Sequence, residues 1–239
     1  MPRFFVDPAA VGETHIRLDP ETLSHIRVLR LGPAETFTVT DGTGIDYRCI
    51  FSDSQAQIID RAINQAEPTI QCAVYLAFTR GERMDFAIQK SVELGASEIC
   101  LFPARRCVVQ HDEKGLLKKL PRWGKIALEA AKQSGRGNIP PVTAASDFSS
   151  AMVQAAKVDQ AFFFYENETQ QSLRQALDQR PDFQTASLVI GPEGGFTEEE
   201  ASLALTHGLR SVSLGPRILR AETAPAAALA AVMFYTGNL

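Results

Sequence analysis

Apolar residues are spaced differently in two parts of the chain. Up to about residue 68 they form short alternating runs (residues 37–40, 47–51 and 57–59) separated by turn-forming stretches such as Asp41-Gly42-Thr43-Gly44. Alternation with a period of two predicts half-buried strands. Residues 20–30 interrupt this pattern and favour a helix. We therefore expect residues 1–68 to form a small all-β domain with one helix, ending where Pro68 breaks the pattern.

From residue 69 onward, strand patterns alternate with helix patterns. The predicted strands are 74–78, 99–102 and 161–165, and the predicted helices are 84–94, 116–134 and one through Leu173 and Leu177. The first two helices each run into a glycine, Gly95 and Gly135, which is the residue favoured just past a helix end. Nearly continuous apolar strands that alternate with helices predict an α/β domain with a mostly parallel sheet covered on both faces.

Two strand–loop–helix units close this part of the chain, at residues 187–197 and 211–225. Each starts with an apolar, β-branched run and then breaks at Gly-Pro, because glycine relieves the limit on φ and proline fixes the next residue. Thr197 with Glu200 predicts a capping box, and Pro225 suits a first helical turn. Both loops would lie at the carboxyl ends of parallel strands, where open α/β sheets bind ligands.

The residues of these loops do not suit a phosphate ligand. The chain contains neither G-x-G-x-x-G nor a P-loop motif, and Glu193 beside the glycines would repel phosphate. Bare backbone next to a carboxylate suits a cation with hydrogen-bonding edges, such as S-adenosylmethionine. One glycine-rich loop alone is explained as well by a tight turn. A second Gly-Pro loop that also carries Arg220 and Glu222 favours a ligand site.

Composition adds limits on location and on metal binding. None of the apolar runs in the 239 residues approaches the roughly 18 needed to cross a membrane, and the N-terminus lacks a signal-peptide core. We therefore expect a cytoplasmic protein without a membrane partner. The four cysteines, Cys49, Cys72, Cys100 and Cys107, have neither C-x-x-C nor zinc-like spacing. They are interpreted as small packing residues, and no metal is expected.

Charge is unevenly distributed along the chain. The overall net charge of −4 argues against a nucleic-acid partner, but residues 1–70 carry −4, residues 71–140 carry +5 and residues 141–239 carry −5. The positive middle is a candidate footprint for a phosphate backbone. A solvated basic helix face accounts for it equally well.

The two loops resemble the signature of the bacterial 16S ribosomal RNA (uracil-N3) methyltransferases, a family of the SPOUT superfamily of knotted methyltransferases. The resemblance is carried by Gly191-Pro192-Glu193-Gly194-Gly195 and by residues 214–224, Leu-Gly-Pro-Arg-Ile-Leu-Arg-Ala-Glu-Thr-Ala. Four further stretches resemble the family, at residues 80–85, 89–95, 106–107 and 133–136. The family's N-terminal domain is resembled by the spacing of His25, Val28, Leu29 and Arg30. Lys132 departs from the family, which has glutamate there. Without the resemblance, a lone histidine such as His25 on a short helix would more often have a structural role. Lys90 and Glu93 would then be an ordinary ion pair three residues apart on a helix.

The resemblance implies a fold, a cofactor and partners. Residues 1–68 would be a PUA-like, RNA-binding β-barrel, and residues 69–239 a SPOUT-type mostly parallel sheet with a C-terminal trefoil knot. The methyl donor would be S-adenosylmethionine, and the substrate a decoding-region uridine of 16S rRNA, either free or in the small ribosomal subunit. The protein would be a homodimer packed through the apolar helix at residues 225–235, which composition alone predicts to be a buried core helix.

The resemblance also implies site residues. The cofactor-binding residues would be Tyr165, Glu166, Ile190, Gly191, Glu193, Gly195, Leu214, Gly215, Ile218, Leu219, Arg220 and Thr223. The RNA-binding residues would be Arg3, Arg27, Arg30, Arg83, Lys90, Arg106 and Arg136. Attack by uracil N3 requires a base for its proton or a cation near O2 or O4. Arg220 would be the charge stabiliser and Glu222 the base, whereas an ion pair of Arg220 with Glu222 or Glu193 would merely brace the loop.

Three other functions are compatible with parts of the sequence. Ribose 2′-O-methylation by another SPOUT branch is disfavoured because those enzymes end in an asparagine-containing motif, where this chain has residues 214–220, Leu-Gly-Pro-Arg-Ile-Leu-Arg. A non-catalytic RNA-binding assembly factor would not bind S-adenosylmethionine. A nucleotide-metabolising Rossmann enzyme is disfavoured by the missing phosphate motifs.

Overall fold

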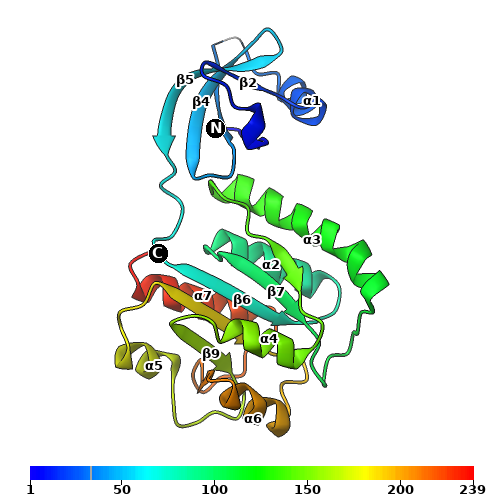
Figure 1. Cartoon of the computed structure of the whole chain (residues 1–239), viewed down its shortest axis with the longest axis vertical. Coiled ribbons are helices and arrows are strands. Elements are labelled where there is room, and N and C mark those ends of the chain that lie inside the picture. Colours follow the sequence, from blue (N-terminus) through cyan, green and yellow to red (C-terminus); the bar gives the residue numbers. More distant parts are fainter. Residues whose placement is uncertain (33) are drawn as a thin grey trace. The chain divides into compact units, whose positions relative to one another are not determined.

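The chain folds into two units in a computed structural model that describes residues 1–32 and 34–239 (Figure 1). The first unit contains residues 1–67 together with residues 131–139, and the second contains residues 68–130 and 140–239. No pattern in the sequence indicates that residues 131–139 group with the first unit. Within the described part of the chain, no helix is both long and apolar enough to cross a membrane.

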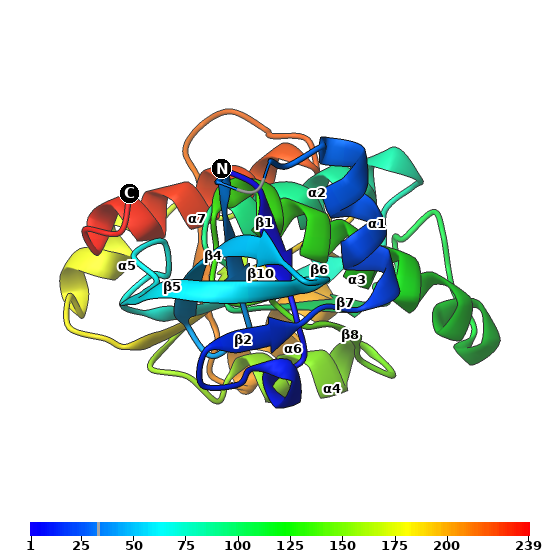
Figure 2. The same ribbon diagram turned by 90° about the horizontal axis from the view of Figure 1, so that it is seen from above.

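The first unit is built on a five-stranded sheet of order β1-β3-β4-β5-β2. Its strands are β1 (Arg3–Phe5), β2 (His15–Arg17), β3 (Thr36–Thr40), β4 (Ile45–Ser52) and β5 (Gln55–Ile63), and its helices are η1 (Pro8–Ala10) and α1 (Pro20–Leu29). β4, β5 and β2 pair antiparallel (Figure 2). The three expected strands and the expected helix are confirmed. β1 and β2 were not predicted, because a strand of three residues is too short to show the alternation of apolar and polar residues.

The core of the first unit shows the expected alternation on β4 around residues 47–49, whereas β3 is buried on both faces. Phe37, Val39 and Cys49 on β3 and β4 are fully buried and pack with Phe4 and Ile26 of β1 and α1. Asp19 caps the start of α1 by accepting a hydrogen bond from the amide of Thr22 at 2.8 Å. The pairings of the described residues give an open strand order, so the PUA-like barrel stays a prediction.

The second unit contains a six-stranded, all-parallel sheet of order β11-β9-β10-β6-β7-β8. Its strands are β6 (Gln71–Ala77), β7 (Glu98–Phe102), β8 (Val142–Ala144), β9 (Gln160–Phe164), β10 (Thr185–Ile190) and β11 (Arg210–Val212). Its helices are α2 (Glu82–Glu93), most of α3 (Glu113–Ser134), α4 (Phe148–Ala155), α5 (Leu173–Gln179), α6 (Glu198–Thr206) and α7 (Thr223–Tyr235). The predicted parallel α/β sheet is confirmed, although β8 and α4 were not anticipated.

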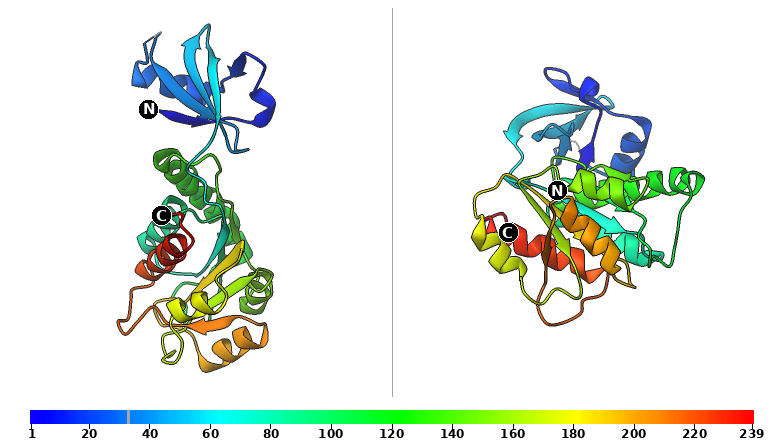
Figure 3. Two further views of the ribbon diagram at one scale, coloured as in Figure 1. Left: turned by 90° about the vertical axis from the view of Figure 1, so that its left-hand side faces the viewer. Right: turned by 60° about the horizontal axis from the view of Figure 1, so that its bottom comes forward.

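Helices cover both faces of this sheet. α2 and α7 pack together on one face, where α7 contacts β6 and β10, and α4 and α6 pack on the other (Figure 3). The four cysteines are free and buried, as expected of packing residues. The prediction that α7 is buried all round is wrong on one side, because Phe234 is 73% exposed.

Candidate active site

Three neighbouring strand ends form a cavity in the second unit. β9 pairs with both β10 and β11, so the residues that follow these strands leave the sheet side by side. They line a cavity of about 600 Å³, formed by residues 164–166 and 190–195 and by the end of β11 with the loop after it. The two Gly-Pro loops, which lie about twenty residues apart in sequence, therefore face the same space. We call residues 191–195 the Glu193 loop and residues 213–221 the Arg220 loop.

The expected cofactor residues lie in one place. All of them line the cavity except Thr223, which is the first residue of α7. The amide of Thr223 instead donates to the carbonyl of Arg220 at 2.8 Å, which closes the turn that leads into the helix. Their roles in binding a cofactor stay predictions, but their convergence is a property of the fold.

The Glu193 loop is held tightly by its surroundings. Gly195 has φ of +69°, so a side chain there would be strained, and its Cβ would overlap the carboxylate of Glu166. That carboxylate accepts a hydrogen bond from the amide of Phe196 at 3.0 Å. Phe196 is 1% exposed and packs on Phe163 with ring centroids 4.3 Å apart. The shape of this loop is therefore set by buried contacts.

The helix after the Glu193 loop begins as predicted. Thr197 and Glu200 form the expected capping box at the start of α6, each side chain accepting from the backbone amide of the other residue. Glu200 also accepts a hydrogen bond from the amide of Arg105 at 2.7 Å. The end of this loop is thus tied to the segment that follows β7.

The Arg220 loop has fewer restraints. Residues 215–218 are exposed, and the side chain of Ile218 is 81% exposed. The amide of Gly215 donates to the hydroxyl of Ser213 at 3.0 Å. Arg220 is exposed and lines the cavity. Its guanidinium is therefore placed where it can meet a ligand.

Arg83 joins the glutamates of the two loops. Its Nη1 lies 3.1 Å from Oε1 of Glu193, and its Nε lies 3.9 Å from Oε1 of Glu222. The amide of Arg80 also donates to Glu193 at 3.3 Å. The bracing ion pairs that the sequence left open for Arg220 are not found among the described residues, because Arg83 takes that place. Sequence reasoning missed this role, since no spacing connects residue 83 with residues 193 and 222.

The two glutamates keep one oxygen each without a partner. Oε2 of Glu193 and Oε2 of Glu222 are buried and have no hydrogen-bond partner within the described part of the chain. A buried carboxylate oxygen without a donor is costly, so it favours a ligand that brings a positive charge or an N–H group. Glu193 lines the cavity, whereas Glu222 lies next to the lining residue Ala221.

The residues expected to bind RNA have different surroundings. Arg27 and Arg30 are exposed at the end of α1. Lys90 forms the ordinary helix pair with Glu93 at 2.7 Å. Arg106 donates to the carbonyl of Gly194 at 3.2 Å, and so supports the Glu193 loop. His25 packs edge-on against Phe4 with ring centroids 5.5 Å apart.

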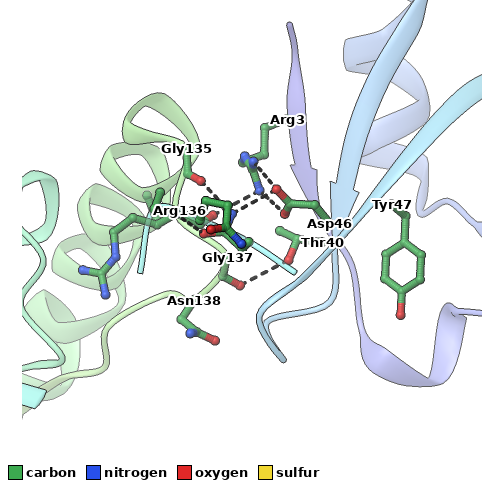
Figure 4. A network of polar contacts seen from close by, with 12 residues as sticks. Arg3, Thr40, Asp46, Tyr47, Gly135, Arg136, Gly137 and Asn138 are labelled. Carbon is green, nitrogen blue, oxygen red and sulfur yellow. Dashed lines mark hydrogen bonds and ion pairs between the residues drawn. The ribbon is translucent and has the colours of Figure 1, made fainter. Parts of the chain in front are cut away.

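Arg3 and Arg136 have structural partners inside the first unit. Arg3 makes two hydrogen bonds to the carboxylate of Asp46, at 2.6 and 2.8 Å, in a network that also joins Thr40 to the carbonyl of Gly137 (Figure 4). The side chain of Arg136 is 4% exposed and lies 2.8 Å from Glu67. RNA contacts by these two arginines would require their carboxylate partners to release them.

Sequence reasoning overlooked several lining residues. They flank the predicted positions and are Phe164, Pro192, Gly194, Val212, Ser213, Arg217, Ala221 and Ala224. Most are adjacent in sequence to a residue of the two motifs. A prediction that every residue of each loop lines the cavity would have included most of them.

Comparison with known proteins identifies the family. The model of the RNA methyltransferase domain family matches residues 65–233. The ribosomal RNA small subunit methyltransferase E of Bacillus subtilis is 32% identical over 226 residues, which cover 90% of this chain and 88% of that protein.

Solved structures agree with this match. A ribosomal RNA small subunit methyltransferase E from Neisseria gonorrhoeae, solved bound to S-adenosyl methionine, is 32% identical, with a TM-score of 0.85 over 98% of this chain and 97% of that one. A protein from Legionella pneumophila solved with bound cofactor SAM is 30% identical, with a TM-score of 0.84 over 97% and 96% of the two chains. The chain therefore belongs to the ribosomal RNA small subunit methyltransferase E family.

Proposed function

We propose that this protein transfers a methyl group from S-adenosylmethionine to N3 of a uridine in 16S rRNA. The observation that carries the proposal is the meeting of the Glu193 and Arg220 loops around one cavity of about 600 Å³. A volume of this order suits a ligand of nucleoside size. Two solved relatives were obtained with the same methyl donor bound.

The residues around the cavity fit S-adenosylmethionine. Gly191 and Leu214 line the cavity, and their main chain would offer hydrogen-bonding groups for an adenine edge. The unpartnered oxygen of Glu193 offers negative charge for the cationic part of the donor. When bound, S-adenosylmethionine supplies an electrophilic methyl group on a positively charged sulfur. The protein's own task is then to position and activate the acceptor.

Arg220 and Glu222 would activate the uracil. N3 of uracil carries a proton and attacks only after losing it, which leaves negative charge on O2 and O4. The unpartnered oxygen of Glu222 can accept that proton. Arg220, exposed at the cavity, can stabilise the charge on the uracil oxygens. Because N3 lies on the Watson–Crick edge, the target base must be unpaired when it enters.

The remaining family features complete the proposal. The first unit would act as a PUA-like RNA-binding domain, with Arg27 and Arg30 among its contacts. The family's trefoil knot would lie along the path from β11 to α7, the helix that packs against β10 and β6. A homodimer in the cytoplasm would cover the exposed apolar side of α7 around Phe234.

Mass spectrometry of RNA nucleosides tests the function. Purified protein, S-adenosylmethionine and either 16S rRNA or small subunits from a strain that lacks the enzyme should yield 3-methyluridine. Formation of 2′-O-methyluridine instead would assign the protein to the ribose-methylating branch. Absence of methylation of both substrates, together with absence of donor binding by calorimetry, would favour a non-catalytic assembly factor.

A further inference from the structure

One face of α3 carries a line of basic side chains. Lys114, Lys118, Arg122 and Lys125 follow one another at intervals of four, four and three residues and are all exposed, and Lys119 is exposed beside them. Residues three or four apart share a helix face. Residues 114–128 contain no aspartate or glutamate. This is a surface of one charge sign within the second unit.

Hydrogen bonds to Asp85 fix α3 next to the candidate active site. Trp123 is 4% exposed, and its Nε1 donates to Asp85 at 3.2 Å. Arg122 Nη1 donates to the same carboxylate at 2.8 Å. Asp85 lies in the first turn of α2, two residues after Arg83, which pairs with Glu193 and Glu222. A short series of contacts thus leads from the two loops to the basic face.

A second set of contacts fixes the same end of the sheet. His111, just before α3, packs against Phe78 with ring centroids 4.9 Å apart and against Trp123 with centroids 6.0 Å apart. Phe78 directly follows β6, the neighbour of β10 in the sheet. The start of α3 is therefore held beside the end of β6, at the same edge of the sheet as the strand ends that line the cavity.

We propose that this basic face binds the sugar–phosphate backbone of the RNA next to the target uridine. The inference rests on the proposed function and adds a contact surface to it. Of the five cations, Arg122 is paired with Asp85, whereas the described ion pairs leave the ammonium groups of Lys114, Lys118 and Lys125 available. A rise of about 1.5 Å per residue separates Lys114 from Lys125 by about 16 Å along the helix, which is the span of several phosphates.

RNA binding by a triple variant tests the proposal. Lys114→Ala, Lys118→Ala and Lys125→Ala would be combined in the full chain, and binding to a decoding-region 16S rRNA fragment would be measured over a range of salt concentrations. Each lost phosphate contact lowers the slope of log K against log salt by about 0.7 for single-stranded RNA. We therefore expect a slope smaller by about 2 and an affinity at least about 10-fold weaker. Replacing the same lysines with arginine should restore both.

Matched measurements keep the outcome interpretable. Lys157→Ala, an exposed lysine of the same unit, should bind RNA like the wild type. S-adenosylmethionine affinity and the melting temperature of the triple variant should stay unchanged. Wild-type slope and affinity in the triple variant would overturn the proposal, as would a loss confined to intact subunits, which would assign the face to a ribosomal protein. Failure of the wild type to methylate RNA would instead count against the proposed function.

Discussion

The two loops that line the cavity differ in how they are held. The Glu193 loop is fixed by buried Phe196, by Glu166 against Gly195 and by hydrogen bonds from Arg80 and Arg106. The Arg220 loop is mostly exposed and is tied mainly at its ends, through Ser213 and the turn into α7. We infer that the two loops have different roles. The Glu193 loop would form a rigid side of the cavity, and the Arg220 loop would carry a side chain, Arg220, that can move toward the substrate.

Removal of the Arg220 side chain should have the largest effect. The Arg220→Ala variant should transfer methyl groups about 100-fold to 1,000-fold more slowly, because charge stabilisation in the transition state is lost. Its affinity for S-adenosylmethionine should change only a few-fold, since main-chain groups remain in place. Single-turnover kinetics and calorimetry measure the two quantities. Arg174→Ala, which removes an exposed arginine that pairs with Asp178 and lies over the ring of Tyr235, serves as the control.

Full activity in the Arg220→Ala variant would exclude the guanidinium from the mechanism. An equal loss of rate and donor affinity would show that Arg220 shapes the pocket and does not act on the acceptor.

A methyl group added to each loop should distinguish the rigid loop from the adaptable one. Gly195 and Gly215 both have positive φ, +69° and +109°, but only a Cβ at Gly195 would strike a neighbour, Glu166. Backbone strain costs about 1–3 kcal/mol at either position, and displacement of Glu166 adds to it at Gly195. We expect Gly195→Ala to weaken S-adenosylmethionine binding more than Gly215→Ala does, by about 100-fold against about 10-fold. The reverse order in calorimetric titrations would contradict the comparison.

Loss of the arginine that joins the loops should have an intermediate effect. Arg83→Met keeps the length of the side chain but leaves Glu193 and Glu222 without their shared cation. Arg83 is 42% exposed, so each pair contributes about 1 kcal/mol at most, and kcat/KM should fall about 10-fold. Arg83→Lys should recover part of the loss. Arg174→Ala, which breaks a pair with Asp178 within α5, is the control, and equal effects of the two substitutions would refute the joining role.

The smallest effect concerns stability of the other unit. Burial would raise the pKa of Glu67, but hydrogen bonds and charge from Arg136, with the amides of Asn138 and Gly137, outweigh it and lower the pKa below its usual 4.5. Because the folded-state pKa is lowered, this stabilisation is complete above the unfolded value and is lost as pH falls through the folded one. Chemical denaturation at several pH values should show a shallower loss of unfolding free energy below pH 4.5 for Glu67→Gln. If the unfolding free energy of the wild type and of Glu67→Gln fell equally with pH, the stabilising role of Glu67 would be contradicted.

The sequence predicted the parallel sheet and placed both loops at the carboxyl ends of its strands, because both features depend on local signals. Glycine–proline breaks, the capping box of Thr197 and the apolar runs of β9 and β10 are each visible within ten residues. Arg83 was assigned to RNA because nothing local reveals its partners, which lie more than one hundred residues away. The carboxylate partners of Arg3 and Arg136 could not be predicted for the same reason. Ion pairs between residues that are distant in sequence depend on the fold, and no pattern in the sequence reveals them.

Hydrogen exchange with and without S-adenosylmethionine tests the central claim most directly, because it reports on both loops in one experiment. If one ligand lies between them, amides of residues 193–196 and of residues 217–221 should be protected together, with the larger gain in the more exposed Arg220 loop. Protection of one loop alone, or of neither at saturating ligand, would contradict a shared binding site.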